Sequence, residues 1–151
     1  MIALKASIEQ NHKDDHKTTI LILDADTDFN SRREEILNDF AGYEVPISLF
    51  LFPNNNSAGS LETILCEIAI EITIINCFEN YEACIVGYEP PVTKSKVFAY
   101  LDALLPANRK KNDHNDLIQE KNRNYRVAAH WNLNHAHLQA LREFLNQFIL
   151  S

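Results

Sequence analysis

Two aspartates, Asp24 and Asp26, stand at the end of an apolar run that extends over residues 18–23. Alternate side chains of an extended chain point to the same side, and residues two apart have Cα atoms about 6.6 Å from each other. Two carboxylates at that spacing can bind one hard divalent cation such as Mg²⁺. Aspartate is also favoured in turns, because it hydrogen-bonds nearby backbone. The pattern therefore predicts either a metal site or a structural turn.

A third carboxylate, Glu62, falls near the start of a helix that should follow the second strand. In a parallel sheet this helix begins at the same edge as the two aspartates, where open sheets bind ligands. Glu62 is therefore a candidate catalytic carboxylate or a further magnesium ligand. The alternative is structural, because the helix dipole stabilises an acidic residue in the first turn. Asp28 is either an outer group of the site or, with Asn30 or Ser31, a helix cap.

These carboxylates must be positioned by an alternation of strands and helices. Ser31 and Glu34 form a capping-box pattern, and Gly42 can end the helix that they begin. Strand–helix–strand–helix order favours a parallel sheet. The expected elements are a strand over 18–23, a helix over 31–40, a strand over 47–52, a loop over 54–59 and a helix capped by Ser60.

The rest of the chain is expected to be mainly helical. Residues 70–86 are ambiguous, because Ile70, Ile72 and Ile74 alternate like a strand while later apolar residues repeat like a helix; the length of the segment favours a helix. Further helices are expected over 2–11, 94–105 and 138–148, and a polar loop over 108–124. The fold class is therefore α/β, with a small, mostly parallel sheet and a mainly helical carboxyl-terminal half.

Size and charge limit the classes of function. With 151 residues, 46% of them hydrophobic, the chain predicts a single domain over 1–151. The net charge of −7 argues against coating nucleic acid by bulk electrostatics, but it allows local phosphate binding through a metal. Neither a signal peptide nor a membrane-length apolar segment is recognised, so we expect a soluble cytoplasmic protein without a membrane partner.

The cysteines and histidines suggest no second site. The three cysteines lack paired spacing, which favours a reducing compartment, and Cys77 and Cys84 are expected to be small core residues. His130, His135 and His137 match no common zinc spacing and are expected to be structural. Trp131 and Leu133 are expected to pack the last helix.

Other polar residues have ordinary structural explanations. Asparagines 54–56 could offer amides to a phosphate or to a hydrated metal, but asparagine-rich turns after strands are common. Lys94, Lys96 and the basic residues 109–111 could contact phosphates, although lysines at helix starts and in polar loops are usually just solvated. None of these residues is assigned to the site.

Taken in order, four segments resemble a prokaryotic family with a Toprim-like core, distantly similar to the nuclease domain of the overcoming-lysogenization-defect proteins. The resemblance covers nearly the whole chain. The segments are Ile22-Leu23-Asp24-Ala25-Asp26; Phe50-Leu51-Phe52-Pro53-Asn54-Asn55 leading to Gly59-Ser60-Leu61-Glu62; Lys94-Ser95-Lys96-Val97-Phe98-Ala99-Tyr100-Leu101; and Trp131-Asn132-Leu133-Asn134-His135 ahead of Leu141-Arg142-Glu143-Phe144-Leu145.

The resemblance implies that Asp24 and Asp26 bind Mg²⁺ or Mn²⁺ for phosphodiester chemistry on nucleic acid. It also implies a glutamate on an earlier strand for acid–base chemistry. Glu9 is the only glutamate upstream, and it lies where a helix is expected. The chain is therefore either a carboxyl-terminal piece of a longer protein or a member that has lost a catalytic group. In the second case it is a non-catalytic interaction or scaffold module.

Two further expectations concern partners and a competing fold. Because only two strands are identified, the missing edge of the sheet could be supplied by an unrecognised strand, a second copy or a partner chain. A phospho-acceptor receiver domain also has an acidic pair after a strand, but it needs an acceptor aspartate at the end of a later strand. Phe52-Pro53-Asn54 offers none, so this alternative is set aside.

Overall fold

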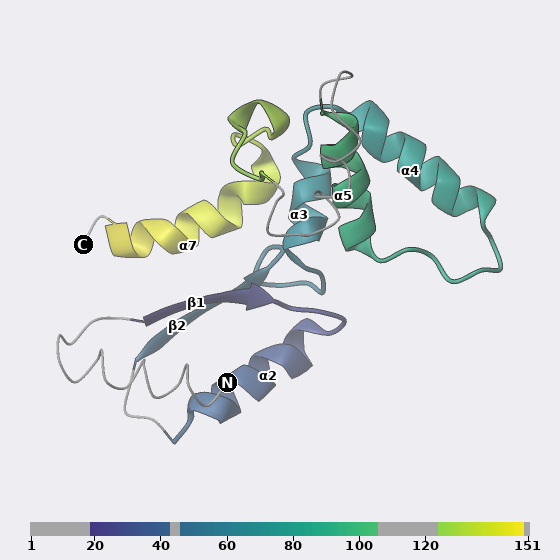
Figure 1. Cartoon of the computed structure of the whole chain (residues 1–151). Helices are drawn as coiled ribbons and strands as arrows, with labels where there is room; N and C mark the ends of the chain where they lie inside the picture. The colour runs from purple at the N-terminus through teal and green to yellow at the C-terminus, as the bar shows by residue number, and fades with distance from the viewer. Residues whose placement is uncertain (1–18, 43–45, 106–123, 150–151) are drawn as a thin grey trace. The chain divides into compact units, whose positions relative to one another are not determined.

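The computed structural model describes residues 19–42, 46–105 and 124–149. These residues belong to two compact units, which are described separately. The first contains β1, α2, β2, the start of α3 and, near the carboxyl end, η3 and α7; the second extends from Leu65 to His135 (Figure 1). The helix expected over 2–11 and nearly all of the loop expected over 108–124 lie outside the described residues.

The first unit is built on two parallel strands, β1 (Thr19–Asp24) and β2 (Ile47–Phe52). Their register pairs Thr19 with Ile47 and Asp24 with Phe52. Both strands and their parallel arrangement are confirmed. The Ala25 N–H donates to the Phe52 carbonyl at 3.1 Å, so the pairing continues to the first residue after β1.

Side chains alternate between the two faces of this small sheet. On one face Leu21 and Leu51 pack in a cluster with Ile36 and Phe40 of α2. Phe50 is completely buried, and its ring lies 5.3 Å from that of Phe144 in α7. Each such burial stabilises the fold by about 1.5–3 kcal/mol. Two hydrophobic clusters therefore hold the strands whose ends carry the acidic residues.

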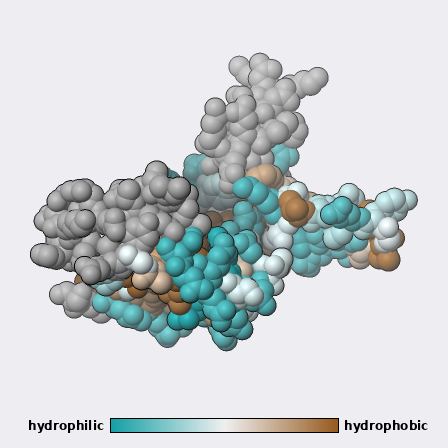
Figure 2. Space-filling view, turned by 90° about the horizontal axis from the view of Figure 1, so that it is seen from below, coloured by the Kyte–Doolittle hydropathy of each residue, from teal (hydrophilic) through white to brown (hydrophobic). Residues whose placement is uncertain are grey.

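Helix α2 (Phe29–Phe40) begins two residues earlier than predicted. Its N-cap is Asp28, whose Oδ1 accepts the Ser31 N–H at 2.7 Å. The prediction that the helix begins at Ser31 is wrong, whereas the interpretation of Asp28 as a helix cap is confirmed, because its carboxylate reaches the third amide of the helix. Seen from below, the outward surface of α2 is hydrophilic (Figure 2).

Helix α3 (Leu61–Glu67) follows β2, as predicted, and Ser60 stands immediately before it. Thr63 Oγ1 accepts the Ser60 N–H at 3.1 Å, which satisfies one amide at the start of the helix. At the carboxyl end, η3 (Ala136–Leu138) leads directly into α7 (Gln139–Ile149), which confirms the last expected helix.

The second unit is helical, as expected for this part of the chain. Helix α4 (Ile72–Cys84) resolves the ambiguity over 70–86 in favour of a helix, and α5 (Thr93–Ala103) confirms the next one. The unit also contains η2 (Ala128–His130). Lys96 joins the two long helices, because its Nζ lies 3.1 Å from Glu82 and 3.5 Å from Glu79.

The core of the second unit differs in part from the prediction. Tyr100 and Trp131 are buried with their rings 5.2 Å apart, whereas Leu133 is 55% exposed, so its expected packing role is wrong. Cys77 and Cys84 are exposed, which overturns their assignment to the core. Both cysteines lie on a solvent-exposed side of α4. Residues that are adjacent in a helical sequence point in different directions, so the apolar residues next to these cysteines did not predict their burial. None of the helices in the described ranges has the length and apolar character needed to cross a membrane.

Candidate functional site

The carboxyl ends of the two strands form a rim in the first unit, and both following helices begin there. Asp24 ends β1, Asp26 lies in the turn that follows, and Glu62 lies in the first turn of α3. The parallel arrangement thus places all three predicted site residues at one end of the sheet. We call Asp24, Asp26, Arg32 and Glu62 the rim residues.

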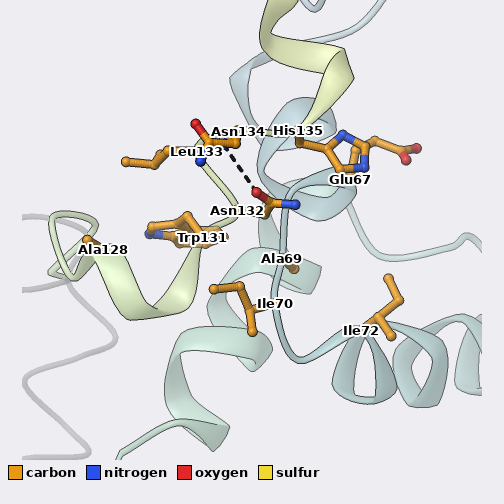
Figure 3. A pocket seen from close by; sticks show the side chains of 10 residues that line it. All are labelled: Glu67, Ala69, Ile70, Ile72, Ala128, Trp131, Asn132, Leu133, Asn134 and His135. Carbon is orange, nitrogen blue, oxygen red and sulfur yellow. Dashed lines mark hydrogen bonds between the residues drawn. The ribbon is translucent and has the colours of Figure 1, made fainter.

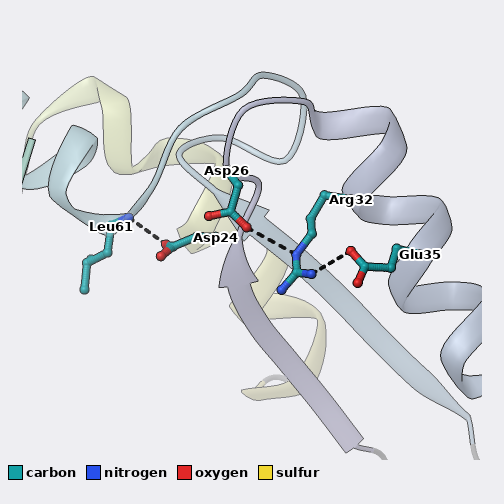
Figure 4. A network of polar contacts seen from close by, with 5 residues as sticks. All are labelled: Asp24, Asp26, Arg32, Glu35 and Leu61. Carbon is teal, nitrogen blue, oxygen red and sulfur yellow. Dashed lines mark hydrogen bonds and ion pairs between the residues drawn. The ribbon is translucent and has the colours of Figure 1, made fainter. Parts of the chain in front are cut away.

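Asp24 caps a helix that begins 37 residues later in the chain. Its Oδ1 accepts the Leu61 N–H at 2.8 Å, as Figure 4 shows. The first amides of a helix lack intrahelical partners, and a carboxylate there gains both a hydrogen bond and a favourable dipole interaction. Asp24 therefore fastens the start of α3 to the end of β1.

Asp26 has an unusual backbone conformation that joins the two loops of the rim. Its φ is +56°, in the left-handed region, which aspartate tolerates better than most residues. Its N–H donates to the Gly59 carbonyl at 2.9 Å, and the Gly59 N–H donates back at 2.8 Å. A Cβ on Gly59 would lie 3.0 Å from both Pro53 and Thr63, so this contact requires glycine.

The Asp26 side chain forms an ion pair with Arg32 of α2. Asp26 Oδ2 lies 3.5 Å from Arg32 Nε, and Arg32 Nη1 donates to Glu35 Oε2 at 2.7 Å (Figure 4). The two aspartates are therefore engaged with different partners, Asp24 with the start of α3 and Asp26 with α2. The sequence analysis did not identify Arg32 as a site residue. Its position in the first turn of a helix that follows an acidic loop could have indicated it.

The electrostatic environment raises the pKa of Asp24. Its partial burial has the largest effect, and the nearby negative charges of Glu62 and Asp26 add to it. The hydrogen bond from Leu61 and the positive charge of Arg32 act in the opposite direction. Three carboxylates thus lie close enough to repel one another, which is the arrangement that a bound cation would relieve.

The asparagine-rich loop after β2 is held by its own side chains. Asn54 Oδ1 accepts the N–H of Asn56 at 3.1 Å and of Ser57 at 2.9 Å. Asn55, with a φ of +60°, accepts the Leu51 N–H through its Oδ1 and donates its own N–H to the Leu51 carbonyl. The side-chain oxygens of these two residues serve the turn, which agrees with the structural interpretation.

The second unit contains a separate pocket of about 800 Å³. Apolar side chains line part of it, and Figure 3 shows Glu67 and His135 on the opposite side of the view from Leu133. Asn132 Oδ1 accepts the Asn134 N–H at 3.1 Å within the lining. The lining residues are Glu67, Ala69, Ile70, Ile72, Ala128, Trp131, Asn132, Leu133, Asn134 and His135.

Among the residues that the structure describes, no group of three or more His, Cys, Asp or Glu side chains is arranged to hold a metal ion. Lys96, one of the candidate phosphate contacts, is paired with two glutamates, and residues 109–111 lie outside the described ranges. Comparison of the chain with protein-family models, curated proteins and solved structures gave no match.

Proposed function

We propose that the chain is a Toprim-like domain that binds a magnesium ion at its rim for phosphodiester chemistry on nucleic acid. The observation that carries the proposal is the placement of Asp24, which is partly buried and lies beside two more carboxylates at the carboxyl end of a parallel strand; the raised pKa of Asp24 agrees with this placement. Perturbed carboxylates at such an edge are typical of functional sites. The resemblance of the four segments supports the choice of reaction.

The donor chemistry of the two aspartates fits magnesium. The contacts recorded among the described residues engage Oδ1 of Asp24 and Oδ2 of Asp26, that is, one oxygen of each carboxylate. Mg²⁺ usually keeps several waters and takes one or two carboxylates together with substrate phosphates. Two aspartates that leave coordination positions for water and phosphate fit this preference of Mg²⁺ better than a site made entirely of protein ligands would.

The rim residues would have different roles in the reaction. Asp24 and Asp26 would hold the ion, with Asp24 kept in place by the Leu61 N–H. Glu62 would be the catalytic carboxylate beside it, since α3 brings it within electrostatic range of Asp24. A bound Mg²⁺ neutralises charge that develops on the phosphoryl oxygens.

Isothermal titration with Mg²⁺ and Mn²⁺ tests the metal site directly. We expect binding to the wild type, and loss of binding when Asp24→Asn and Asp26→Asn are combined. Asp28→Asn is the matched control, because it removes a charge from the same turn and keeps an oxygen that can cap α2. Absence of binding to the wild type, or binding unchanged by the double substitution, would disprove the site.

Turnover is tested with labelled single- and double-stranded DNA and RNA in the presence of Mg²⁺. Glu62→Gln should lower cleavage by about a hundredfold or more if the carboxylate transfers a proton, and it should leave the fold intact because the side chain is only partly buried. Cleavage that Glu62→Gln leaves unchanged would remove Glu62 from the catalytic role.

A second candidate is a non-catalytic interaction module with the same Toprim-like fold. Two observations favour it: each aspartate already has a protein partner, and the second unit presents a partly apolar pocket. Exposed apolar surface around a pocket is typical of protein contacts. Metal binding without cleavage of any of the four nucleic-acid forms would favour this candidate over the enzyme.

A further inference from the structure

Arg32 is held at the rim by two contacts of unequal quality. Its Nη1 lies 2.7 Å from Glu35 Oε2, which is the short distance of a charge-assisted hydrogen bond. Its Nε lies 3.5 Å from Asp26 Oδ2, which is an ion pair without a hydrogen bond. The arginine is therefore anchored on α2 and only loosely attached to the aspartate.

The loose contact leaves a polar atom unsatisfied. The Nε–H of Arg32 is buried and finds no hydrogen-bond acceptor among the described residues. A buried donor without an acceptor is costly, so an oxygen that approached more closely than Asp26 Oδ2 would be favoured there. The Arg32 side chain as a whole is 27% exposed, so a ligand can reach the guanidinium.

We propose that Arg32 exchanges partners at the rim: it pairs with Asp26 in the absence of substrate, and it binds a phosphate oxygen when a divalent cation takes Asp26. This inference rests on the proposed function, because it assigns a phosphate-positioning residue to the same site. It also explains why Asp26 has an ion-pair partner in the structure.

The chemistry of arginine suits this exchange. A guanidinium presents planar N–H donors that match phosphate oxygens, and it stays charged throughout. Glu35 keeps its hydrogen bond to Nη1 in both states and so limits how far the guanidinium can move. When the cation neutralises Asp26, the arginine loses its attraction to that carboxylate, and a cation-bound phosphate offers a new negative partner close by.

The first test is titration of Mg²⁺ alone into the wild type, Arg32→Gln and Arg33→Gln. Arg33→Gln is the matched control, because this substitution removes the same positive charge from an exposed position on the same helix. If Arg32 competes with the cation for Asp26, Arg32→Gln should bind Mg²⁺ about two- to fivefold more tightly than Arg33→Gln. Equal affinities of the two variants would overturn the competition.

The second test measures binding of thymidine 5′-monophosphate in saturating Mg²⁺; this probe has a phosphate but no phosphodiester bond to cleave. Arg32→Gln should weaken its binding by at least about tenfold, as expected for loss of a hydrogen bond to a charged group. Arg32→Lys should give an intermediate loss, because it keeps the charge but not the paired donors. An unchanged affinity in Arg32→Gln would refute the phosphate contact.

The outcomes separate this inference from the proposed function. If the wild type binds Mg²⁺, but Arg32→Gln binds Mg²⁺ like Arg33→Gln and binds thymidine 5′-monophosphate like the wild type, the metal site stands and the role of Arg32 is refuted. If only Arg32→Gln binds Mg²⁺, both are refuted, because the exchange requires the cation to take Asp26 in the wild type. Circular dichroism of each variant checks that the helices are retained, so a folding defect is not read as a binding effect.

Discussion

At the scale of single residues, the rim aspartates combine a structural contact with a position suited to chemistry. Asp24 accepts the Leu61 N–H, so removing the acceptor should cost stability. We expect Asp24→Ala to lower the free energy of unfolding by about 1 kcal/mol, the usual value of a lost helix cap. Asp24→Asn keeps an oxygen acceptor and should unfold close to the wild type. Urea denaturation of both variants measures the difference, and equal losses in the two would contradict the capping role.

The pH dependence of stability should differ in sign between two neighbouring aspartates. Burial and adjacent carboxylates raise the pKa of Asp24 in the folded state, so its ionisation opposes folding, and its contribution improves as the pH falls through that pKa. Hydrogen bonds from Ser31 lower the pKa of Asp28, so its contribution is lost as the pH falls. Carboxyl NMR titration should therefore show Asp24 taking up its proton at a higher pH than Asp28. The opposite order would refute the burial of Asp24.

The three cysteines should react at different rates. Burial raises the pKa of the Cys66 thiol to about 11, despite the nearby positive charge of Lys96, whereas Cys77 and Cys84 are exposed. The thiolate is the reactive form, so Cys66 should be alkylated last. Timed labelling with iodoacetamide at mildly alkaline pH, followed by peptide mass spectrometry, measures the order. Early modification of Cys66 in the folded protein would contradict its burial.

At the scale of elements, the sequence predicts the two strands best. Residues 19–24 and 47–52 are short apolar runs closed by aspartate or proline, and no competing periodicity disturbs them. The start of α2 was misplaced because Ser31 and Asp28 are both good caps, and only the 2.7 Å hydrogen bond shows that Asp28 prevails. Periodicity was equally unable to decide α4, where alternating isoleucines match a strand as well as a helix.

The rim itself was predictable only in part. The acidic pair and Glu62 stand out because carboxylates follow strands in a pattern with known chemistry. The contacts that organise them do not stand out, since the Asp26–Gly59 bridge and the Asp24–Leu61 hydrogen bond join segments more than 30 residues apart. Long-range contacts of this kind depend on the strand register, which residue types alone do not give.

Tyr100 fixes the segment around Trp131 to α5 in the second unit. Its hydroxyl donates to the His130 carbonyl at 2.6 Å and accepts the Glu71 N–H at 3.4 Å, and the ring is completely buried. Tyr100→Phe leaves both groups without that partner and should cost about 1–3 kcal/mol of stability. Tyr81→Phe is the matched control, because Tyr81 is 51% exposed and should lose almost nothing. Equal thermal midpoints for the two variants would contradict the role of the hydroxyl.

At the scale of the whole molecule, the sheet is the least complete feature. Helices cover both of its faces, but within the described ranges β1 pairs with β2 and with no other strand. An edge strand with unpaired backbone groups is a template for another chain, and β1 has no proline or lysine to prevent such pairing. The net charge of −7 opposes close association but does not block backbone pairing at one edge.

We therefore expect the chain to form a dimer through the edge of β1 that has no strand partner among the described residues. Ile22 is 38% exposed on that strand, so Ile22→Lys should fit the folded unit while opposing the approach of a second copy. Light scattering coupled to size-exclusion chromatography should show a dimer for the wild type and a monomer for the variant. Ile149→Lys, at a position 73% exposed near the end of α7, makes the same change away from the strand and should leave the dimer intact. A wild type that is monomeric at every concentration, or an Ile22→Lys variant that still forms the dimer, would exclude this edge as the interface.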